Sequence, residues 1–100
     1  MTIFETLQST GLPCVYSHFK NKGKKPPYIA YIGNGQLNQD ADNTHYWREN
    51  TYQVEYYFTD KDEAKETAIE DALLENGFLY EKSEDIFLEG ENVFLIYYYI

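Results

Sequence analysis

Three residues of this chain could bind a metal ion or act as a nucleophile: Cys14, His18 and His45. A metal site needs two to four ligands that converge on one point. Cys14 and His18 are four positions apart, which suits a helix, but their segment predicts a strand, where they would lie about 13 Å apart. A Cys–His nucleophile pair meets the same obstacle, and no oxyanion-hole glycine motif accompanies it. We expect neither a metal centre nor a catalytic pair here.

Two further patterns have a chemical and a structural interpretation. Gly33-Asn-Gly35 is similar to part of a phosphate-binding loop, but such a loop opens a helix and needs further glycines, so a turn is the better interpretation. Glu66 and Glu70 are one helical turn apart and could hold a hard cation, although this spacing is ordinary on exposed helices. We therefore predict a protein that is not an enzyme and has no cofactor.

Length and composition predict one soluble domain. A chain of 100 residues has the common size of a single domain, and it can bury roughly 60–70% of its unfolded surface. The N-terminal residues do not have signal-peptide form, and the longest apolar run is too short to span a bilayer. The single cysteine cannot form an internal disulfide, which fits a reducing cytoplasm. These features favour a cytosolic protein without membrane contact.

The net charge of −9 is concentrated in one part of the chain. Twelve acids and three lysines lie between Asp60 and Glu91, whereas the remainder is neutral. An acidic sector disfavours non-specific binding of nucleic acid. The neutral remainder holds one basic cluster: Lys20, Lys22, Lys24 and Lys25. This cluster could contact a phosphate or an acidic protein, but a lysine-rich loop is more often simply solvated.

The first half predicts a short helix, two strands and a long loop. Thr2 and Glu5 indicate a capping box for a helix over Thr2–Ser9. The predicted strands are Cys14–Phe19 and Tyr28–Ile32. Gly33–Thr44 has turn composition, which predicts a polar loop over about residues 33–45. Long loops without structure tend to be functional, so this loop is the best candidate for a binding arm.

Four residues of or near this loop are candidate partner contacts. Three of them, Gln36, Leu37 and Asn38, lie within the loop. The fourth is Trp47, the single tryptophan, which follows the loop. A tryptophan at the base of a long loop is often a packed anchor, so a core position is the favoured interpretation of Trp47 and a partner contact is the second.

The second half, from Thr51 to Ile100, predicts a strand, a helix and a hairpin. Over Thr51–Thr59 apolar and polar residues alternate, which buries one face of a strand. Thr59 or Asp60 would cap the helix, and Asn76-Gly77 would end it. Its predicted packing stripe is Ala64, Ala68, Ile69, Ala72 and Leu73, with Glu66, Glu70 and Glu75 pointing outward. A final hairpin would turn at Glu89-Gly-Glu-Asn92.

The expected fold is α+β, with element order α-β-β-β-α-β-β, a mostly antiparallel sheet and the second helix across one face. Eleven tyrosines are unusual for this length. Neighbouring strand residues point to opposite faces, so Tyr56-Tyr57 and Tyr97-Tyr98-Tyr99 must place tyrosines on both sides of the sheet. The tyrosines indicate either a protein interface or a sheet with one solvated face.

The chain resembles tail completion proteins of siphophages and prophages of Gram-positive bacteria, also called tail terminator or tail-to-head joining proteins. Three strings carry the resemblance: Thr10-Gly-Leu-Pro13, Pro27-Tyr-Ile29 and the stretch from Asn43 to Asp62, followed by the acidic helix and Tyr80-Glu-Lys-Ser-Glu-Asp-Ile86. The likeness extends over most of the chain as a pattern of elements and short strings, without a catalytic signature.

The resemblance implies a structural protein of the virion, made in the host cytoplasm. Such proteins cap the tail tube as a hexameric ring, contacting the major tail tube protein and a head-completion or connector protein. Ring contacts are head-to-tail, so two different surfaces must match. The lysine cluster and the acidic helix, including Glu66 and Glu70, are the expected opposite partners. No specific nucleic-acid sequence would be bound.

Two alternatives remain open. One is an acidic mimic of DNA that inhibits a nuclease or restriction system, which the net charge of −9 permits. The other is a different head–tail connector component of the same particle.

Overall fold

The computed structural model describes residues 2–16, 25–41 and 45–100, and within 36–41 and 45–49 it describes the backbone. The helices are α1 (Ile3–Gln8) and α2 (Glu63–Glu75), and the strands are β1 (Cys14–Tyr16), β2 (Tyr28–Ala41), β3 (His45–Phe58), β4 (Glu81–Lys82), β5 (Ile86–Leu88) and β6 (Val93–Tyr99). The α+β class is confirmed. The expected order is confirmed as well, with the two-residue β4 added before the last hairpin.

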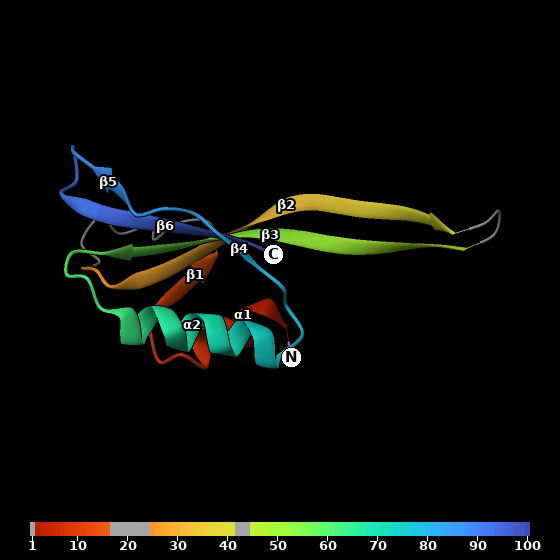
Figure 1. The fold of residues 1–100 in the computed structure, drawn as a ribbon, viewed down its shortest axis with the longest axis horizontal. Helices are drawn as coiled ribbons and strands as arrows, with labels where there is room; N and C mark the ends of the chain where they lie inside the picture. Colours follow the sequence, from red (N-terminus) through yellow and green to blue (C-terminus); the bar gives the residue numbers. More distant parts are fainter. Residues whose placement is uncertain (1, 17–24, 42–44) are drawn as a thin grey trace.

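The described strands form one sheet in the order β1-β2-β3-β6-β4, and β5 also pairs with β6 (Figure 1). β1 runs parallel to β2, whereas the other pairings are antiparallel. β4 and β5 share one edge of β6, where Glu81 pairs with Tyr99 and Leu88 pairs with Val93. β6 therefore lies inside the sheet, between β3 on one side and β4 and β5 on the other.

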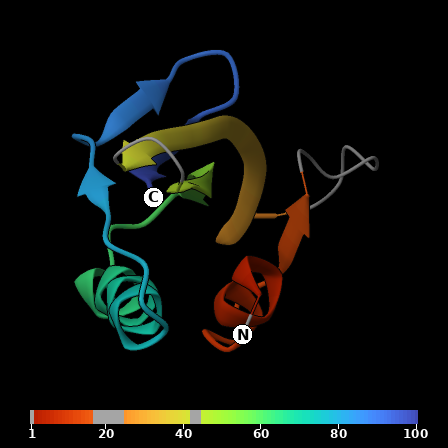
Figure 2. The ribbon, with the colours of Figure 1, turned by 90° about the vertical axis from the view of Figure 1, so that its right-hand side faces the viewer.

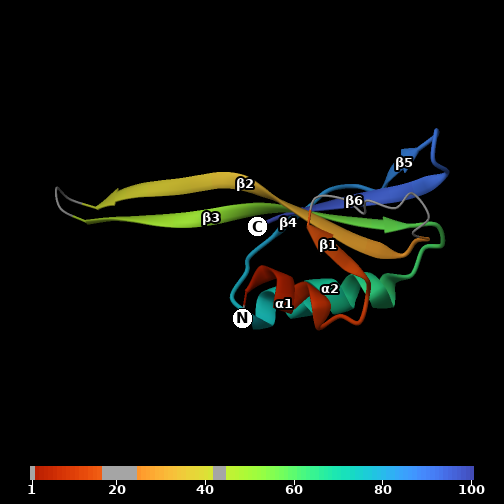
Figure 3. The same ribbon diagram turned by 180° about the vertical axis from the view of Figure 1, so that it is seen from behind.

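Both helices cover the same face of the sheet (Figures 1 and 3). Seen along the long hairpin, the sheet curls over α1 and α2, which lie side by side (Figure 2). The predicted alternation in β3 is confirmed, because Val54, Tyr56 and Phe58 are buried against the helices. The core consists of Ile3, Leu7, Ile29, Val54, Tyr56, Phe58, Ile69, Leu73, Ile96 and Tyr98.

The helix ends follow local hydrogen-bonding chemistry. Thr2 and Glu5 form both halves of the predicted capping box of α1. The predicted cap of α2 is wrong: Asp62, and not Thr59 or Asp60, accepts the hydrogen bond from the backbone N–H of Ala64 at 3.0 Å. The residues after Phe58 are needed to carry the chain from the sheet down to the helix layer, so α2 begins later. Gly77, with φ +84°, ends α2 as predicted.

The predicted polar loop over residues 33–45 is wrong, because most of it belongs to a long hairpin. β2 continues to Ala41 and pairs with β3 as far as His45. A register shift between Gly33 and Gln36 marks a bulge, and Gly35 has φ +92°, a conformation that glycine adopts without strain. The polar, glycine-containing composition that predicted a loop therefore belongs to a two-stranded hairpin with a bulge. Residues 42–44, the remainder of the predicted loop, lie outside the described residues.

We call the ribbon of residues 36–41 and 45–50 the arm. Six residue pairs, from Gln36–Asn50 to Ala41–His45, hold it together. It extends away from the helices and the rest of the sheet (Figure 1), in a molecule whose longest dimension is 51 Å and whose others are 25 and 24 Å. The arm accounts for the elongated shape of the protein.

The remaining strand predictions hold in part. β1 ends at Tyr16, and the rest of the predicted strand Cys14–Phe19 lies outside the described residues. The predicted final turn is confirmed, because the N–H groups of Glu91 and Asn92 both donate to the carbonyl of Leu88. Neither described helix is long and apolar enough to cross a membrane.

Candidate functional site

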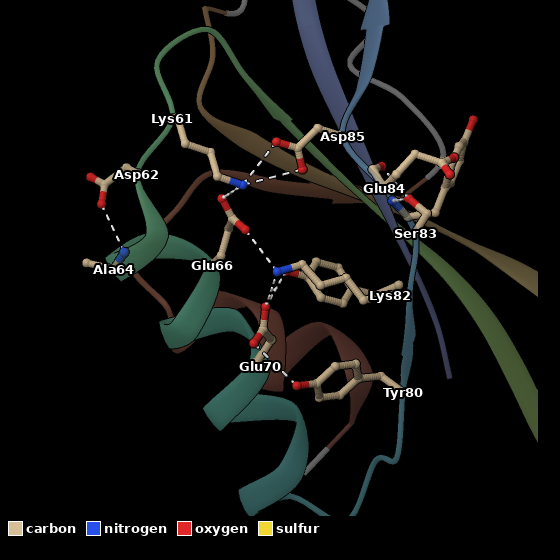
Figure 4. Close-up of polar contacts among 12 residues, drawn as sticks. Lys61, Asp62, Ala64, Glu66, Glu70, Tyr80, Lys82, Ser83, Glu84 and Asp85 are labelled. Atoms are coloured by element: carbon tan, nitrogen blue, oxygen red, sulfur yellow. Dashed lines mark hydrogen bonds and ion pairs between the residues drawn. The ribbon is translucent and has the colours of Figure 1, made fainter.

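The structure corrects the prediction that Glu66 points outward. The Glu66 side chain is only 3% exposed and lies between two lysines (Figure 4). Its Oε1 lies 2.9 Å from Lys82 Nζ, and its Oε2 lies 2.8 Å from Lys61 Nζ. Lys61 also forms an ion pair with Asp85 at 3.0 Å. Position 66 is three residues before Ile69 and seven before Leu73, so it belongs to the packing stripe of α2.

Glu70, one turn later, accepts three hydrogen bonds. They come from Tyr98 Oη at 2.8 Å, Tyr80 Oη at 3.3 Å and Lys82 Nζ at 2.9 Å. Burial raises the pKa of Glu70, but the hydrogen bonds from Lys82 and Tyr98 outweigh it, so the net direction is downward. Burial and the hydrogen bond to Glu70 both raise the pKa of Tyr98.

Lys82 joins the two carboxylates. Its burial lowers its pKa, but the hydrogen bonds to Glu70 and Glu66 raise it, and the net direction is upward. Each charged group of this network has an opposite charge within 3.0 Å, so the two glutamates hold lysines where a cation would have to sit. Among the described residues, no group of three or more His, Cys, Asp or Glu side chains could hold a metal ion. The network fastens α2 to β4 and β6.

The described residues line at least two hollows on the surface. The first, of about 520 Å³, lies where the arm joins the body and is lined by Asn34, Thr51, Leu79, Tyr80, Glu81, Tyr99 and Ile100. The second, of about 330 Å³, lies near the start of α2, and its charged lining residues are Asp60, Lys61, Asp62 and Lys65. Tyr56 also lines the second hollow, where burial raises the pKa of its hydroxyl to about 12. Neither hollow gathers a catalytic set of side chains.

The sheet face opposite the helices is rich in tyrosine. Tyr28 stacks on Tyr57 with ring centroids 4.8 Å apart, and Tyr97 stacks on Tyr99 at 5.8 Å. Tyr57 donates a hydrogen bond to Glu55 at 2.9 Å, and burial followed by this bond raises the pKa of Tyr57. These rings combine apolar area with polar ends, the combination that protein interfaces favour. We call this set of residues the tyrosine face.

The arm has two edges, and no described strand pairs with the outer part of either. β1 pairs with β2 only as far as Tyr31, and β6 pairs with β3 only from Gln53 onward. A two-stranded ribbon alone is at best marginally stable in water, and an open edge is a template for another strand. The arm is therefore the element most suited to contact another chain.

The candidate residues fall into separate places. Lys20, Lys22 and Lys24 lie outside the described residues, and Lys25 is exposed. The other candidates, apart from the two glutamates, lie on the arm, where Gln36, Leu37 and Asn38 pair with Asn50, Glu49 and Arg48, and Trp47 pairs with Gln39. The side chain of Trp47 lies outside the described part, but its backbone is near the end of the arm and not at the base of a loop.

Sequence reasoning missed Lys61, Lys82 and Tyr98 as partners of the two glutamates. The signal for Glu66 was its position in the apolar stripe of α2, where an acid requires a buried partner. Comparison with known proteins adds no relative: no family model, no curated protein and no solved structure matches this chain.

Proposed function

We propose that this protein caps the tail tube of a siphophage-type particle and joins the tail to the head as a subunit of a hexameric ring. Its partners would be further copies of itself, the major tail tube protein and a head-completion or connector protein. The virion would be its place of action, and the protein would act by burying interfaces, without bond chemistry. The resemblance of its sequence strings to tail completion proteins suggests the role, and the arm is the structural observation that carries it.

The arm supports an assembly role because it extends from the body with unpaired outer edges. A contact with the tube or with a neighbouring subunit would give these backbone groups partners. The tyrosine face would add buried area, since tyrosines are enriched at the energetic centres of interfaces. Exposed ion pairs contribute only about 0.2–1 kcal/mol each, so charge would set orientation and tyrosine burial would supply affinity.

The acidic half of the ring contact needs revision. Glu66 and Glu70 already have lysine partners inside the molecule, so their carboxylates are poorly placed to pair with a neighbouring subunit. The exposed acids Glu63, Asp71 and Glu75 on α2 take their place in the proposal. They would meet the lysine cluster of the neighbouring subunit.

The arm's role is tested by replacing residues 36–49 with a short Gly-Ser turn. We expect the circular dichroism and urea midpoint of the body to stay close to those of the full chain, whereas joining of purified heads and tails is lost. Electron microscopy of the joined particles gives the readout. Normal joining by the shortened protein would rule out this role for the arm.

Ring assembly is tested by reversing the charge of Lys20, Lys22 and Lys24 to glutamate. Native mass spectrometry, alone and with tail tubes, should show that hexamers are lost. A matched variant with the three lysines changed to arginine keeps the charge and should keep the hexamers. Unchanged hexamers in the glutamate variant would refute the proposed pairing of lysines with acids.

The alternative of a DNA mimic is favoured by one observation. Eight exposed acids between Asp60 and Glu91 have no ion pair among the described residues: Asp60, Glu63, Asp71, Glu75, Glu81, Glu84, Glu89 and Glu91. Displacement of DNA from a nuclease by the purified protein would support mimicry over tail completion.

A further inference from the structure

The edge of β3 that faces away from β2 is open beyond the point where β6 ends. Tyr52 and Ile100 exchange two backbone hydrogen bonds, of 3.1 and 3.0 Å, at the last step of the β3–β6 ladder. From Thr51 to His45 no described strand lies beside this edge of β3, and we call the vacant strand position the open lane. In an antiparallel strand every second residue directs its N–H and C=O to the same side, so Arg48 and Tyr46 direct theirs as Tyr52 does, into the open lane.

An extended strand fits this lane because its backbone groups repeat with the same spacing. The open stretch is seven residues long, from His45 to Thr51, and a second copy of the chain carries an edge of the same length and polarity. Two such edges can pair antiparallel about a two-fold axis, so that the backbone N–H and C=O groups of each edge form hydrogen bonds with those of the other. One kind of chain then supplies both sides of the contact.

The side on which the backbone groups point limits the registers of such a pair. Antiparallel pairing about a two-fold axis can centre on Arg48, which overlaps all seven open residues, or on Trp47 or Glu49, each of which overlaps five. Centring on Glu49 would set two glutamates directly opposite, which is destabilising. Centring on Arg48 would set two arginines directly opposite, which is destabilising. Centring on Trp47 sets Arg48 opposite Tyr46 and His45 opposite Glu49, so like charges do not meet. We propose that two copies of this protein pair arm to arm along β3, with the two-fold axis at Trp47.

The surface beside the lane also fits this arrangement. The hollow of about 520 Å³ lies at the body end of the lane, and Thr51 and Ile100 line it. Its wall includes Leu79, which is 82% exposed, and Tyr99, which is 40% exposed. In the Trp47 register the partner's strand would begin opposite Glu49, about 7 Å from Thr51. The end of the partner's arm would therefore lie beside the hollow that holds these two exposed apolar side chains.

This contact goes beyond the proposed ring and does not depend on it. It uses one edge of the arm, it reaches only Tyr99 of the tyrosine face, and it leaves α2 uncovered. It is isologous, whereas the ring contacts would be head-to-tail. Evidence for one kind of contact therefore does not decide the other.

Disulfide trapping tests the register. Residues at the axis would have Cα atoms about 4.5 Å apart, within the range of about 4.4–6.8 Å that a disulfide spans. Trp47→Cys should give a covalent dimer under mild oxidation at pH 8, whereas Arg48→Cys should not. The native Cys14 is half-buried and its pKa is raised to about 11 by burial, so its thiol stays protonated and competes little.

A second pair of variants keeps the tryptophan. His45→Cys and Glu49→Cys should each stay uncross-linked alone and should form a mixed disulfide when the two proteins are combined. A dimer trapped by Arg48→Cys and not by Trp47→Cys would overturn the register. Absence of cross-links in all these variants would overturn the arm-to-arm contact, even if hexameric rings still form on tail tubes.

The apolar wall is tested without cysteine. Leu79→Asp should weaken self-association by roughly tenfold or more in sedimentation velocity, with an unchanged urea midpoint, because Leu79 is exposed in the monomer. Leu74→Asp is the matched control, since Leu74 is 50% exposed on α2 and does not line the hollow. Equal self-association of the wild type and both variants, or a wild-type monomer at millimolar concentration, would contradict the proposal.

Discussion

The ammonium of Lys82 on β4 lies 2.9 Å from the buried carboxylate of Glu66 on α2. This contact connects the edge of the sheet to the helix that covers it, across sixteen residues of sequence. Glu66 retains Lys61 on its other oxygen, so the buried charge has two opposite charges beside it. The position of α2 on the sheet therefore depends on the two lysines that contact the two carboxylate oxygens of Glu66.

Lys82→Met should lower the free energy of unfolding by about 2 kcal/mol, because hydrogen bonds to charged groups contribute about 1.5–3 kcal/mol and Lys82 is partly exposed. The double variant Lys82→Met, Glu66→Leu should recover most of this loss, since the buried charge is removed as well. Urea unfolding measures both. Lys65→Met is the control, because its pair with Asp62 is exposed and should contribute less than about 1 kcal/mol.

Lowering the pH should weaken the attachment of α2 to the sheet, because the Glu70 carboxylate becomes protonated. Its pKa in the folded protein is below the ordinary value of about 4.3, so its contribution to stability is complete above that pH and is lost as the pH falls through the folded pKa. Glu70→Gln should therefore flatten the decrease in unfolding free energy below about pH 4.3. Glu75→Gln, on the exposed end of the same helix, should keep the slope of the wild type. Equal slopes for the two variants would contradict the role given to Glu70.

Loss of the hydroxyl should destabilise the protein at one buried tyrosine and not at another. The Tyr98 hydroxyl donates to Glu70 at 2.8 Å, so Tyr98→Phe should cost about 1–2 kcal/mol. The buried Tyr56 hydroxyl has no hydrogen-bond partner among the described residues, so Tyr56→Phe should leave stability unchanged or raise it by up to about 1 kcal/mol. Thermal and urea unfolding give both values. A loss for Tyr56→Phe as large as that for Tyr98→Phe would show that the Tyr56 hydroxyl has a partner.

The cap of α2 can be located by two substitutions. Asp62→Ala should destabilise the protein by about 1 kcal/mol, because the carboxylate that accepts from Ala64 is lost. Asp60→Ala should change the free energy of unfolding by less than about 0.5 kcal/mol, since Asp60 is exposed and precedes the cap. The reverse ranking in urea unfolding would place the cap at the earlier residue.

The elements with a strong period could be predicted from the sequence. The alternation around Val54 predicted which face of β3 is buried, and Gly77 predicted the end of α2. Both features are present in the structure. The arm could not be predicted, because its residues are polar and its pairing is encoded by the opposite strand more than by its own composition. The carboxylate network was missed for a related reason. Glu66 has a partner sixteen residues away, and helical periodicity shows the face of an acid but not the lysine that reaches it.

The three lysines between Asp60 and Glu91 all have their ammonium groups on carboxylates of the same molecule. The eight exposed acids of that segment have no ion pair within the described part of the chain, so dissolved ions or another chain can neutralise them. The screening length falls from about 10 Å at 0.1 M salt to about 3 Å at 1 M. A contact that brings two acidic sides together should thus strengthen as salt is added, whereas one that sets this side against the lysine cluster should weaken. The sign of the salt dependence of assembly would reveal which surface each copy turns toward the next.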